Sequence, residues 1–135
     1  SRLDSFIRRL EAQRRCLDWA AQLVATIDGP VVELGLGNGR TYDHLRMLLP
    51  SRAIFAFDRQ LSAHPLCVPR GEFFVLGEFG DTLPLALRRI RRHASLCHAD
   101  IGSGDERESI ALAQAIAPMI DRFMTKGGLF WAISQ

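Results

Sequence analysis

The chain has 135 residues, of which 47% are apolar, and its formal net charge at pH 7 is +2. This length suits one hydrophobic core and is short for two, and the small charge gives no indication of a nucleic-acid or membrane partner. No segment reaches the roughly 20 uninterrupted apolar residues of a membrane span, and the first residues lack the apolar centre of a signal peptide, so we expect a single-domain cytoplasmic protein.

The first predicted element is a helix. Apolar residues recur at helical spacing within residues 1–29, and the sequence Asp28-Gly29-Pro30 ends the pattern. We therefore expect an amphipathic helix that packs on the core. Residues 31–34 form an apolar run typical of a buried strand, and a glycine-rich loop and a helix ended by Pro50 follow. Residues 53–58 predict the next strand.

The middle of the chain predicts a loop, a strand and a helix. Two prolines between residues 59 and 71 argue against a long helix there, so we expect a loop. Residues 73–76 predict a third strand. A helix is expected from Thr82 to about Arg92, because Pro84 would lie in its first turn, where the missing N–H has little consequence.

The last predicted elements are a strand, a helix and a strand. Residues 94–99 predict the fourth strand, and a long helix is expected from about Glu106 to Met124, which Pro118 should bend or split. Lys126-Gly127-Gly128 should end this helix before a strand over residues 129–134. Because apolar strands alternate with helices, we expect a parallel sheet covered on both faces, with ligands at the carboxyl ends of the strands.

The cysteines and the arginine clusters predict little chemistry by themselves. Cys16, Cys67 and Cys97 are odd in number and far apart, so we expect buried free thiols and neither a disulfide framework nor a zinc site. Arginines cluster at residues 8–15 and 88–93, each time within a helical pattern that also carries apolar residues. We favour a solvated outer face for each cluster and keep a phosphate-binding patch as the alternative.

The most informative stretch is VVELGLGNGRTY, residues 31–42. Its alternate glycines, between a strand and a helix, let the backbone approach a ligand closely. The dinucleotide fingerprint G-x-G-x-x-G requires a glycine three residues after its second glycine. Arg40 holds that position when the first two glycines are used, and Tyr42 holds it when the last two are used. A bound pyrophosphate is therefore disfavoured.

The stretch instead follows the pattern acidic-x-G-x-G-x-G, which resembles the first motif of class I S-adenosylmethionine-dependent methyltransferases. The cofactor of that family carries an ammonium, a carboxylate, a sulfonium and a ribose diol but no phosphate, so carboxylates near it are favourable. The resemblance implies that Glu33 faces the ammonium side and that the motif as a whole binds the cofactor through Glu33, Gly35, Leu36, Gly37, Asn38 and Gly39.

A second point of resemblance is Asp58, which ends the strand expected over residues 53–58 and lies nineteen residues beyond Gly39. An acidic residue about 20 residues after the loop can accept hydrogen bonds from both ribose hydroxyls. The alternative for Asp58 is a turn or capping residue. Arg59 is expected either to border the adenine or to be solvated.

A third point is the stretch FFVLGEFGDTLP, residues 73–84, which resembles the family segment that contacts the adenine amino group. Gly77-Glu78 occupies the position of the contacting pair, with Glu in place of the commoner Asp. Gly80-Asp81 is a second pair in which glycine precedes an acidic residue, but Asp81 is also suited to cap the following helix. We therefore favour Gly77 and Glu78 as cofactor-binding residues.

The fourth point is LCHADIGSGD, residues 96–105, which resembles the family's region beside the transferable methyl group. This implies that Asp100 binds cofactor and is catalytic. His98, two residues earlier on the same face of the expected strand, is the other catalytic candidate, and its alternative is a hydrogen-bonded structural histidine. Two such ligands fall short of a metal site, so no metal is expected. Tyr42 and His44 are weaker candidates for a general base.

The resemblance covers about residues 30–134, including the helix-Gly-Gly-strand passage of TKGGLFWAIS. It implies a Rossmann-like α/β three-layer sandwich with a mainly parallel sheet of strand order 3-2-1-4-5. The family's C-terminal antiparallel strands are expected to be absent, because the sequence ends after the fifth strand; either the sheet is truncated or further residues follow.

The function that the resemblance implies is S-adenosyl-L-methionine-dependent methyl transfer to an unidentified small-molecule or protein acceptor. Two alternatives remain. One is a non-catalytic module that binds S-adenosylmethionine or S-adenosylhomocysteine. The other is an NAD-dependent oxidoreductase, which the position of Arg40 disfavours. Neither a nucleic-acid partner nor an oligomeric state is indicated by the sequence.

Overall fold

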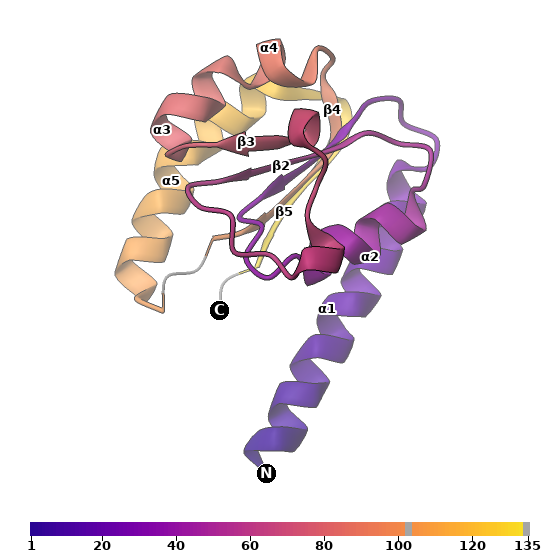
Figure 1. Ribbon diagram of the computed structural model, residues 1–135, viewed down its shortest axis with the longest axis vertical. Helices are drawn as coiled ribbons and strands as arrows, with labels where there is room; N and C mark the ends of the chain where they lie inside the picture. The colour runs from indigo at the N-terminus through magenta and orange to yellow at the C-terminus, as the bar shows by residue number, and fades with distance from the viewer. Residues whose placement is uncertain (102–103, 134–135) are drawn as a thin grey trace.

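The computed structural model describes residues 1–101 and 104–133. Figure 1 shows a sheet between two groups of helices. The strands are β1 (Val31–Leu34), β2 (Ile54–Asp58), β3 (Phe74–Leu76), β4 (Ala94–Asp100) and β5 (Met124–Ile133). All their pairings are parallel, and their order is β3-β2-β1-β4-β5. The predicted Rossmann-like fold and strand order are confirmed.

The central strand β1 aligns the loops that form the edge of the sheet. All four of its residues are buried, as expected of a parallel strand that helices cover on both faces. Leu34, its last residue, lies opposite Phe57 of β2 and Ala99 of β4. The carboxyl ends of β1, β2 and β4 therefore reach the same edge of the sheet, and the loops that follow them meet there.

Two helical layers bury the two faces of the sheet (Figure 1). The helices α1 (Arg2–Val24) and α2 (Arg40–Leu48) cover one face, and α3 (Phe79–Thr82), α4 (Ala86–Ile90) and α5 (Glu106–Phe123) cover the other. The core of the first face includes Leu17, Ala20, Val24, Tyr42, Leu45, Val31, Ile54 and Leu96. The core of the second includes Ala86, Ile90, Ile116, Ile120, Phe123, Val32, Leu34, Phe57 and Cys97.

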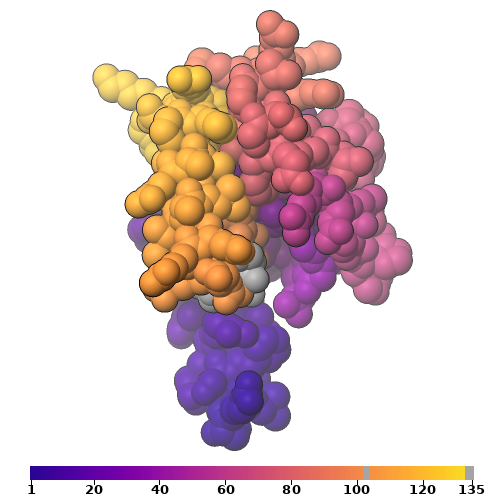
Figure 2. Space-filling model, turned by 90° about the vertical axis from the view of Figure 1, so that its left-hand side faces the viewer, coloured from indigo at the N-terminus to yellow at the C-terminus, as the bar shows by residue number. Residues whose placement is uncertain are grey.

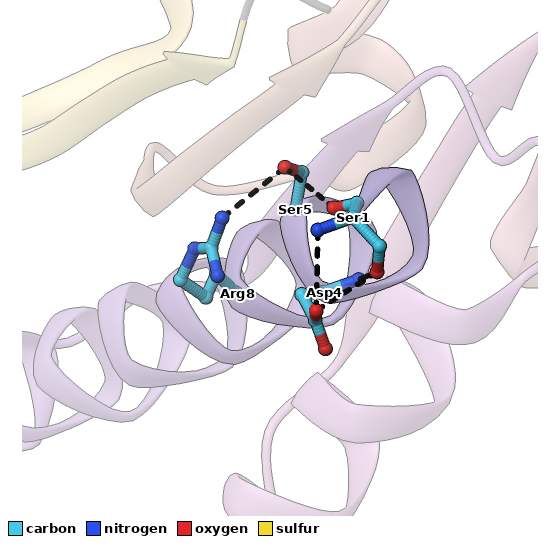
Figure 3. A network of polar contacts seen from close by, with 4 residues as sticks. All are labelled: Ser1, Asp4, Ser5 and Arg8. Carbon is cyan, nitrogen blue, oxygen red and sulfur yellow. Dashed lines mark hydrogen bonds and ion pairs between the residues drawn. The ribbon is translucent and has the colours of Figure 1, made fainter.

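Helix α1 packs on the core only through its second half. Leu17 and Val24 are buried, whereas Leu3 and Phe6 remain 66% and 40% exposed. Figure 2 shows the N-terminal end of the helix projecting beyond the rest of the molecule. Local contacts support that half: Ser1 and Asp4 form a capping box, and Arg8 donates a hydrogen bond to Ser5 Oγ (Figure 3).

The segment after β3 differs from the single helix expected from Thr82 to about Arg92. Helix α3 starts earlier, a 3₁₀ turn spans Leu83–Leu85, and α4 ends at Ile90. The prediction was wrong because Pro84 has no N–H to donate to a preceding carbonyl, so the α-helical ladder is interrupted. Arg91 ends α4 with a left-handed φ of 66°, and its N–H donates to Leu87 O at 2.8 Å.

The predicted boundary between α5 and β5 is also wrong. Pro118 lies within α5 but does not split it, and the helix ends at Phe123. Strand β5 begins at Met124 and not at residue 129. Ala94 pairs with Met124 and Leu96 with Leu129, so the intervening residues of β5 form a bulge, where Gly127 has a φ of 83°. Ser134, the end of the expected strand, lies outside the described residues.

The loop between β2 and β3 contains two 3₁₀ turns, Pro65–Cys67 and Gly71–Phe73, and no longer helix, as predicted. All three cysteines are free. Cys97 is buried, but Cys16 is exposed and Cys67 partly exposed, so the expectation of buried thiols was wrong for these two. Within the described part of the chain, no helix combines the length and apolar character needed to cross a membrane.

Candidate functional site

Two adjoining cavities open at the carboxyl edge of the sheet. The first, the sheet-edge cavity, has a volume of about 460 Å³ and lies among the loops after β1 to β4 and the start of α5. The second, the α1 cavity, has a volume of about 570 Å³ and lies between α1, the start of α2 and β5. Gly37 and Asp100 line both cavities.

The two cavities collect most of the predicted site residues. The sheet-edge cavity is lined by Gly35, Gly37, Asp58, Arg59, Gly77, Glu78 and Asp100. The α1 cavity is lined by Leu36, Gly37, Asn38 and Asp100. Glu33, Gly39 and His98 do not line either cavity.

The three positions of the loop after β1 that hold glycine do so for different structural reasons. A Cβ at Gly35 would collide with the backbone carbonyl of Asp100, and a Cβ at Gly39 would lie 2.6 Å from Cys67 Cβ. These two glycines are required by close packing within the protein. Gly37 has a φ of 55°, and a Cβ there would meet no atom within 4 Å. Gly37 therefore exposes bare backbone to both cavities, where a ligand can approach it.

The carboxylate of Asp58 holds the glycine loop against the end of β2. Its Oδ2 accepts hydrogen bonds from the N–H groups of Leu36 at 2.9 Å and Gly37 at 3.2 Å. Its Oδ1 accepts from the N–H of Arg59 at 2.7 Å. Because a carboxylate offers about four lone-pair positions, these contacts leave capacity for a further donor in the cavity. The sequence had not indicated that Asp58 binds the loop itself.

The turn after β3 brings Glu78, and not Asp81, to the sheet-edge cavity. The Gly77 N–H donates to Asp58 O at 3.0 Å, which fixes this turn beside the end of β2. Glu78 is the N-cap of α3 but makes no side-chain capping bond, and its side chain is exposed at the cavity. Asp81 lies in the first turn of α3, outside the cavity lining. The geometry agrees with the preference for Glu78.

Glu33 of β1 and His98 of β4 form a buried pair within the sheet. Their side chains are 1% and 0% exposed, and His98 Nδ1 lies 2.9 and 3.0 Å from the two carboxylate oxygens. Burial raises the pKa of Glu33 from 4.5 to about 7, although the nearby His98 acts in the opposite direction. The pair was missed in the sequence, but the parallel register of β1 and β4 places the two residues directly opposite each other.

The other side of the His98 ring packs on Trp131 of β5, with ring centroids 4.7 Å apart. His98 Nε2 is buried and has no hydrogen-bond partner among the described residues. These surroundings match the structural alternative for His98, and its catalytic role stays a prediction. Of the two weaker base candidates, Tyr42 is buried and His44 Nε2 lies 2.8 Å from Asp18 Oδ1, which ties α2 to α1.

The α1 cavity contains residues that sequence reasoning did not single out as site residues. Helix α1 contributes Phe6, Arg9 and Gln13, α2 contributes Arg40 and Thr41, and β5 contributes Trp131. Gln13 Nε2 donates to Thr41 Oγ1 at 3.5 Å, which closes the junction between α1 and α2. The arginine cluster at residues 8–15 included Arg9 and Gln13, but nothing in the pattern indicated which side of α1 would face the sheet edge.

Known proteins resemble the chain over its whole length. A family model described as S-adenosyl-L-methionine methyltransferase matches residues 1–135. The crystal structure of an S-adenosyl-L-methionine methyl transferase from Silicibacter pomeroyi DSS-3 is 42% identical, with a TM-score of 0.90; the match covers 100% of this chain and 83% of that one. The calicheamicin methyltransferase CalS11 shares the fold at 19% identity and a TM-score of 0.64, over 92% of this chain and 65% of its own. A search of curated proteins found no match.

Proposed function

The chain belongs to the S-adenosyl-L-methionine methyltransferase family, and from this premise we propose that the sheet-edge cavity binds the cofactor and the α1 cavity binds the methyl acceptor. The protein is an S-adenosyl-L-methionine-dependent methyltransferase, and S-adenosyl-L-methionine is its cofactor. The assignment of the two cavities and of the residues in them is our proposal.

The observation that carries this proposal is the position of Gly37 beside Asp58. Gly37 has open space where a side chain would be, and Asp58 retains acceptor capacity on the same cavity wall. Bare backbone next to a carboxylate suits a nucleoside whose ribose presents two hydroxyl donors and which carries no phosphate. We assign the ribose to Asp58.

The turn after β3 supports the placement of the adenine. Gly77 and Glu78 line the far side of the sheet-edge cavity from the glycine loop, together with the apolar side chain of Phe79. The exposed carboxylate of Glu78 can accept a hydrogen bond from an adenine amino group, and Phe79 offers an apolar surface to the ring. Arg59 borders the same cavity.

Asp100 lines both cavities, and this supports our assignment of Asp100 to a position next to the reacting groups. When bound, the cofactor supplies a sulfonium methyl group, whose transfer to the acceptor leaves S-adenosylhomocysteine. The protein's main contribution is to align the acceptor in the α1 cavity, an effect worth up to roughly 7–11 kcal/mol in the best-oriented models. If the attacking atom of the acceptor must lose a proton, we assign Asp100 as the residue that receives it.

A calorimetric titration with S-adenosylhomocysteine and with NAD, followed by a crystal structure of the S-adenosylhomocysteine complex, tests the proposal. We expect heat from S-adenosylhomocysteine only, and density that spans the glycine loop and Asp58 in the sheet-edge cavity. Density for the nucleoside elsewhere would disprove the site, and heat from NAD alone would disprove the cofactor assignment.

A further inference from the structure

We propose that the methyl acceptor is a small organic acid with a flat apolar body, and that Arg9 and Arg40 bind its anionic group in the α1 cavity. This inference rests on the proposed function, which makes the α1 cavity the acceptor site. It names the chemical class of acceptor, which neither the family nor the fold specifies.

The positive charge comes from two guanidinium groups on different walls of the cavity. Arg9 lies on α1, where its guanidinium carbon is 5.2 Å from the ring centroid of Phe6, and Arg40 is the first residue of α2. In the described part of the chain, neither arginine forms an ion pair with a carboxylate, whereas Arg46 pairs with Asp43 on the same helical layer. Both guanidiniums are therefore available to a carboxylate ligand, which they can bind with paired N–H donors.

The start of α2 adds to this positive field. Its N-cap is Gly39, and its first residues, Arg40 and Thr41, line the cavity, where the Arg40 N–H already donates to Asn38 Oδ1 at 3.1 Å. The N-terminal end of a helix carries partial positive charge from the helix dipole, which favours anions nearby.

The negative charge at the cavity is smaller. Among the described lining residues, Asp100 is the one carboxylate. Arg9 and Arg40 outnumber this carboxylate, so they attract an anionic acceptor, do not attract a neutral one and repel a cationic one. The balance of charge therefore favours an anionic acceptor.

The rest of the cavity is suited to an apolar ring. Trp131 is held on one side by His98, and Phe6, Leu10 and Leu36 add apolar surface. Aromatic side chains bind flat ligands through offset or edge-to-face contacts. A volume of about 570 Å³ lies within the range of about 300–1,000 Å³ typical of small-molecule sites. The occupant that fits both features is an aromatic or similarly flat organic acid.

The test uses probes that differ mainly in charge. They are 3-(4-hydroxyphenyl)propionate, its neutral amide and the cation tyramine, each titrated calorimetrically into the protein saturated with S-adenosylhomocysteine. We expect the propionate to bind about tenfold more tightly than the amide, the change produced by one hydrogen bond to a charged group, and tyramine to bind most weakly. The preference for the anion should decrease between low and high salt, because both arginines are exposed.

Single variants show whether the two arginines cause this preference. Arg9→Gln and Arg40→Gln should each reduce the ratio of propionate to amide affinity severalfold, while Arg14→Gln, on the same helix but outside the cavity lining, should leave the ratio unchanged. Thermal melting monitored by circular dichroism confirms that each variant is folded.

The outcomes separate this inference from the proposed function. Equal affinities for propionate and amide, with S-adenosylhomocysteine still bound, would overturn the inference alone. The inference also fails if the arginine variants weaken S-adenosylhomocysteine binding but leave the ratio unchanged, because the guanidiniums would then serve the cofactor. Failure of S-adenosylhomocysteine to bind would overturn the proposed function and this inference with it.

Discussion

Asp58 and Gly37 are joined by a hydrogen bond from the Gly37 N–H to Asp58 Oδ2, with the two atoms 3.2 Å apart. The bond connects the loop after β1 to the end of β2 and fixes the backbone that faces both cavities. The same carboxylate also accepts the Leu36 N–H, so the loop is held before any ligand arrives. A site arranged in advance loses less conformational entropy when its ligand binds.

The first prediction concerns the open space at Gly37. In Gly37→Asn the new side chain would occupy the space where we place the cofactor, while asparagine tolerates the left-handed φ of 55° better than most residues. We expect the variant to fold and to lose most of its affinity for S-adenosylhomocysteine, as measured by calorimetry. Gly127→Asn is the matched control, because Gly127 also has a positive φ and open space but lies in the bulge of β5. Equal affinity in both variants would contradict the placement.

The second prediction concerns the charge of Asp58. Asp58→Asn removes the charge and one acceptor oxygen, so S-adenosylhomocysteine binding should weaken by about 1–3 kcal/mol, the scale of hydrogen bonds to a charged group. Asp81→Asn, in the first turn of α3 and outside the cavity lining, should bind as the wild type does. A loss of less than about 0.3 kcal/mol in Asp58→Asn, well below the contribution of a hydrogen bond, would remove this residue from the site.

The third prediction separates the packing role of Gly35 from the ligand role of Gly37. Gly35→Ala would drive a Cβ into the backbone carbonyl of Asp100, which cannot rotate away as a side chain can. Strain from the left-handed backbone and from overpacking should lower the free energy of unfolding by about 2–4 kcal/mol. Gly37→Ala meets no neighbour and should lose about 1 kcal/mol, from backbone strain alone. Urea denaturation compares the two, and equal losses would argue against this division of roles.

The fourth prediction concerns the pH dependence of stability that Glu33 causes. Burial raises its pKa from 4.5 in the unfolded chain to about 7 in the folded protein, so the folded state holds the proton more tightly. The contribution of Glu33 to stability is therefore fully present below pH 4.5 and is lost as the pH rises to about 7.

Glu33→Gln measures this effect, because glutamine keeps the shape of the side chain and does not titrate. The free energy of unfolding of the wild type minus that of the variant should fall by about 3 kcal/mol across this pH window, as obtained from urea denaturation at a series of pH values. A difference that stays constant or increases with pH would contradict the raised pKa. Asp28→Asn, on the loop before β1, serves as a control for the procedure.

Most residues of the candidate site that lie close to the end of a strand could be predicted from the sequence. The run of alternate glycines, Asp58, Gly77-Glu78 and Asp100 each lie at or just after the end of a strand, and parallel strands bring their carboxyl ends to one edge. Only the correct strand order was then needed to bring together the predicted residues that line the sheet-edge cavity, which are Gly35, Gly37, Asp58, Gly77, Glu78 and Asp100. The element boundaries at Pro84 and Met124 were mispredicted. Proline and glycine residues indicate that a helix ends nearby, but they do not show at which of several neighbouring residues it ends.

Local sequence patterns were sufficient to predict the family, the sheet and the glycine loop, because hydrophobic periodicity and motif spacing can be recognised within short stretches of sequence. The packing of segments far apart in the sequence decided the rest. It buried Glu33 against His98, directed Asp58 to the loop it supports, and brought Arg9 of the first helix to the same cavity as Arg40. Such relationships depend on the angle and register at which α1 and β4 meet the rest of the molecule, and no short stretch of sequence encodes those quantities.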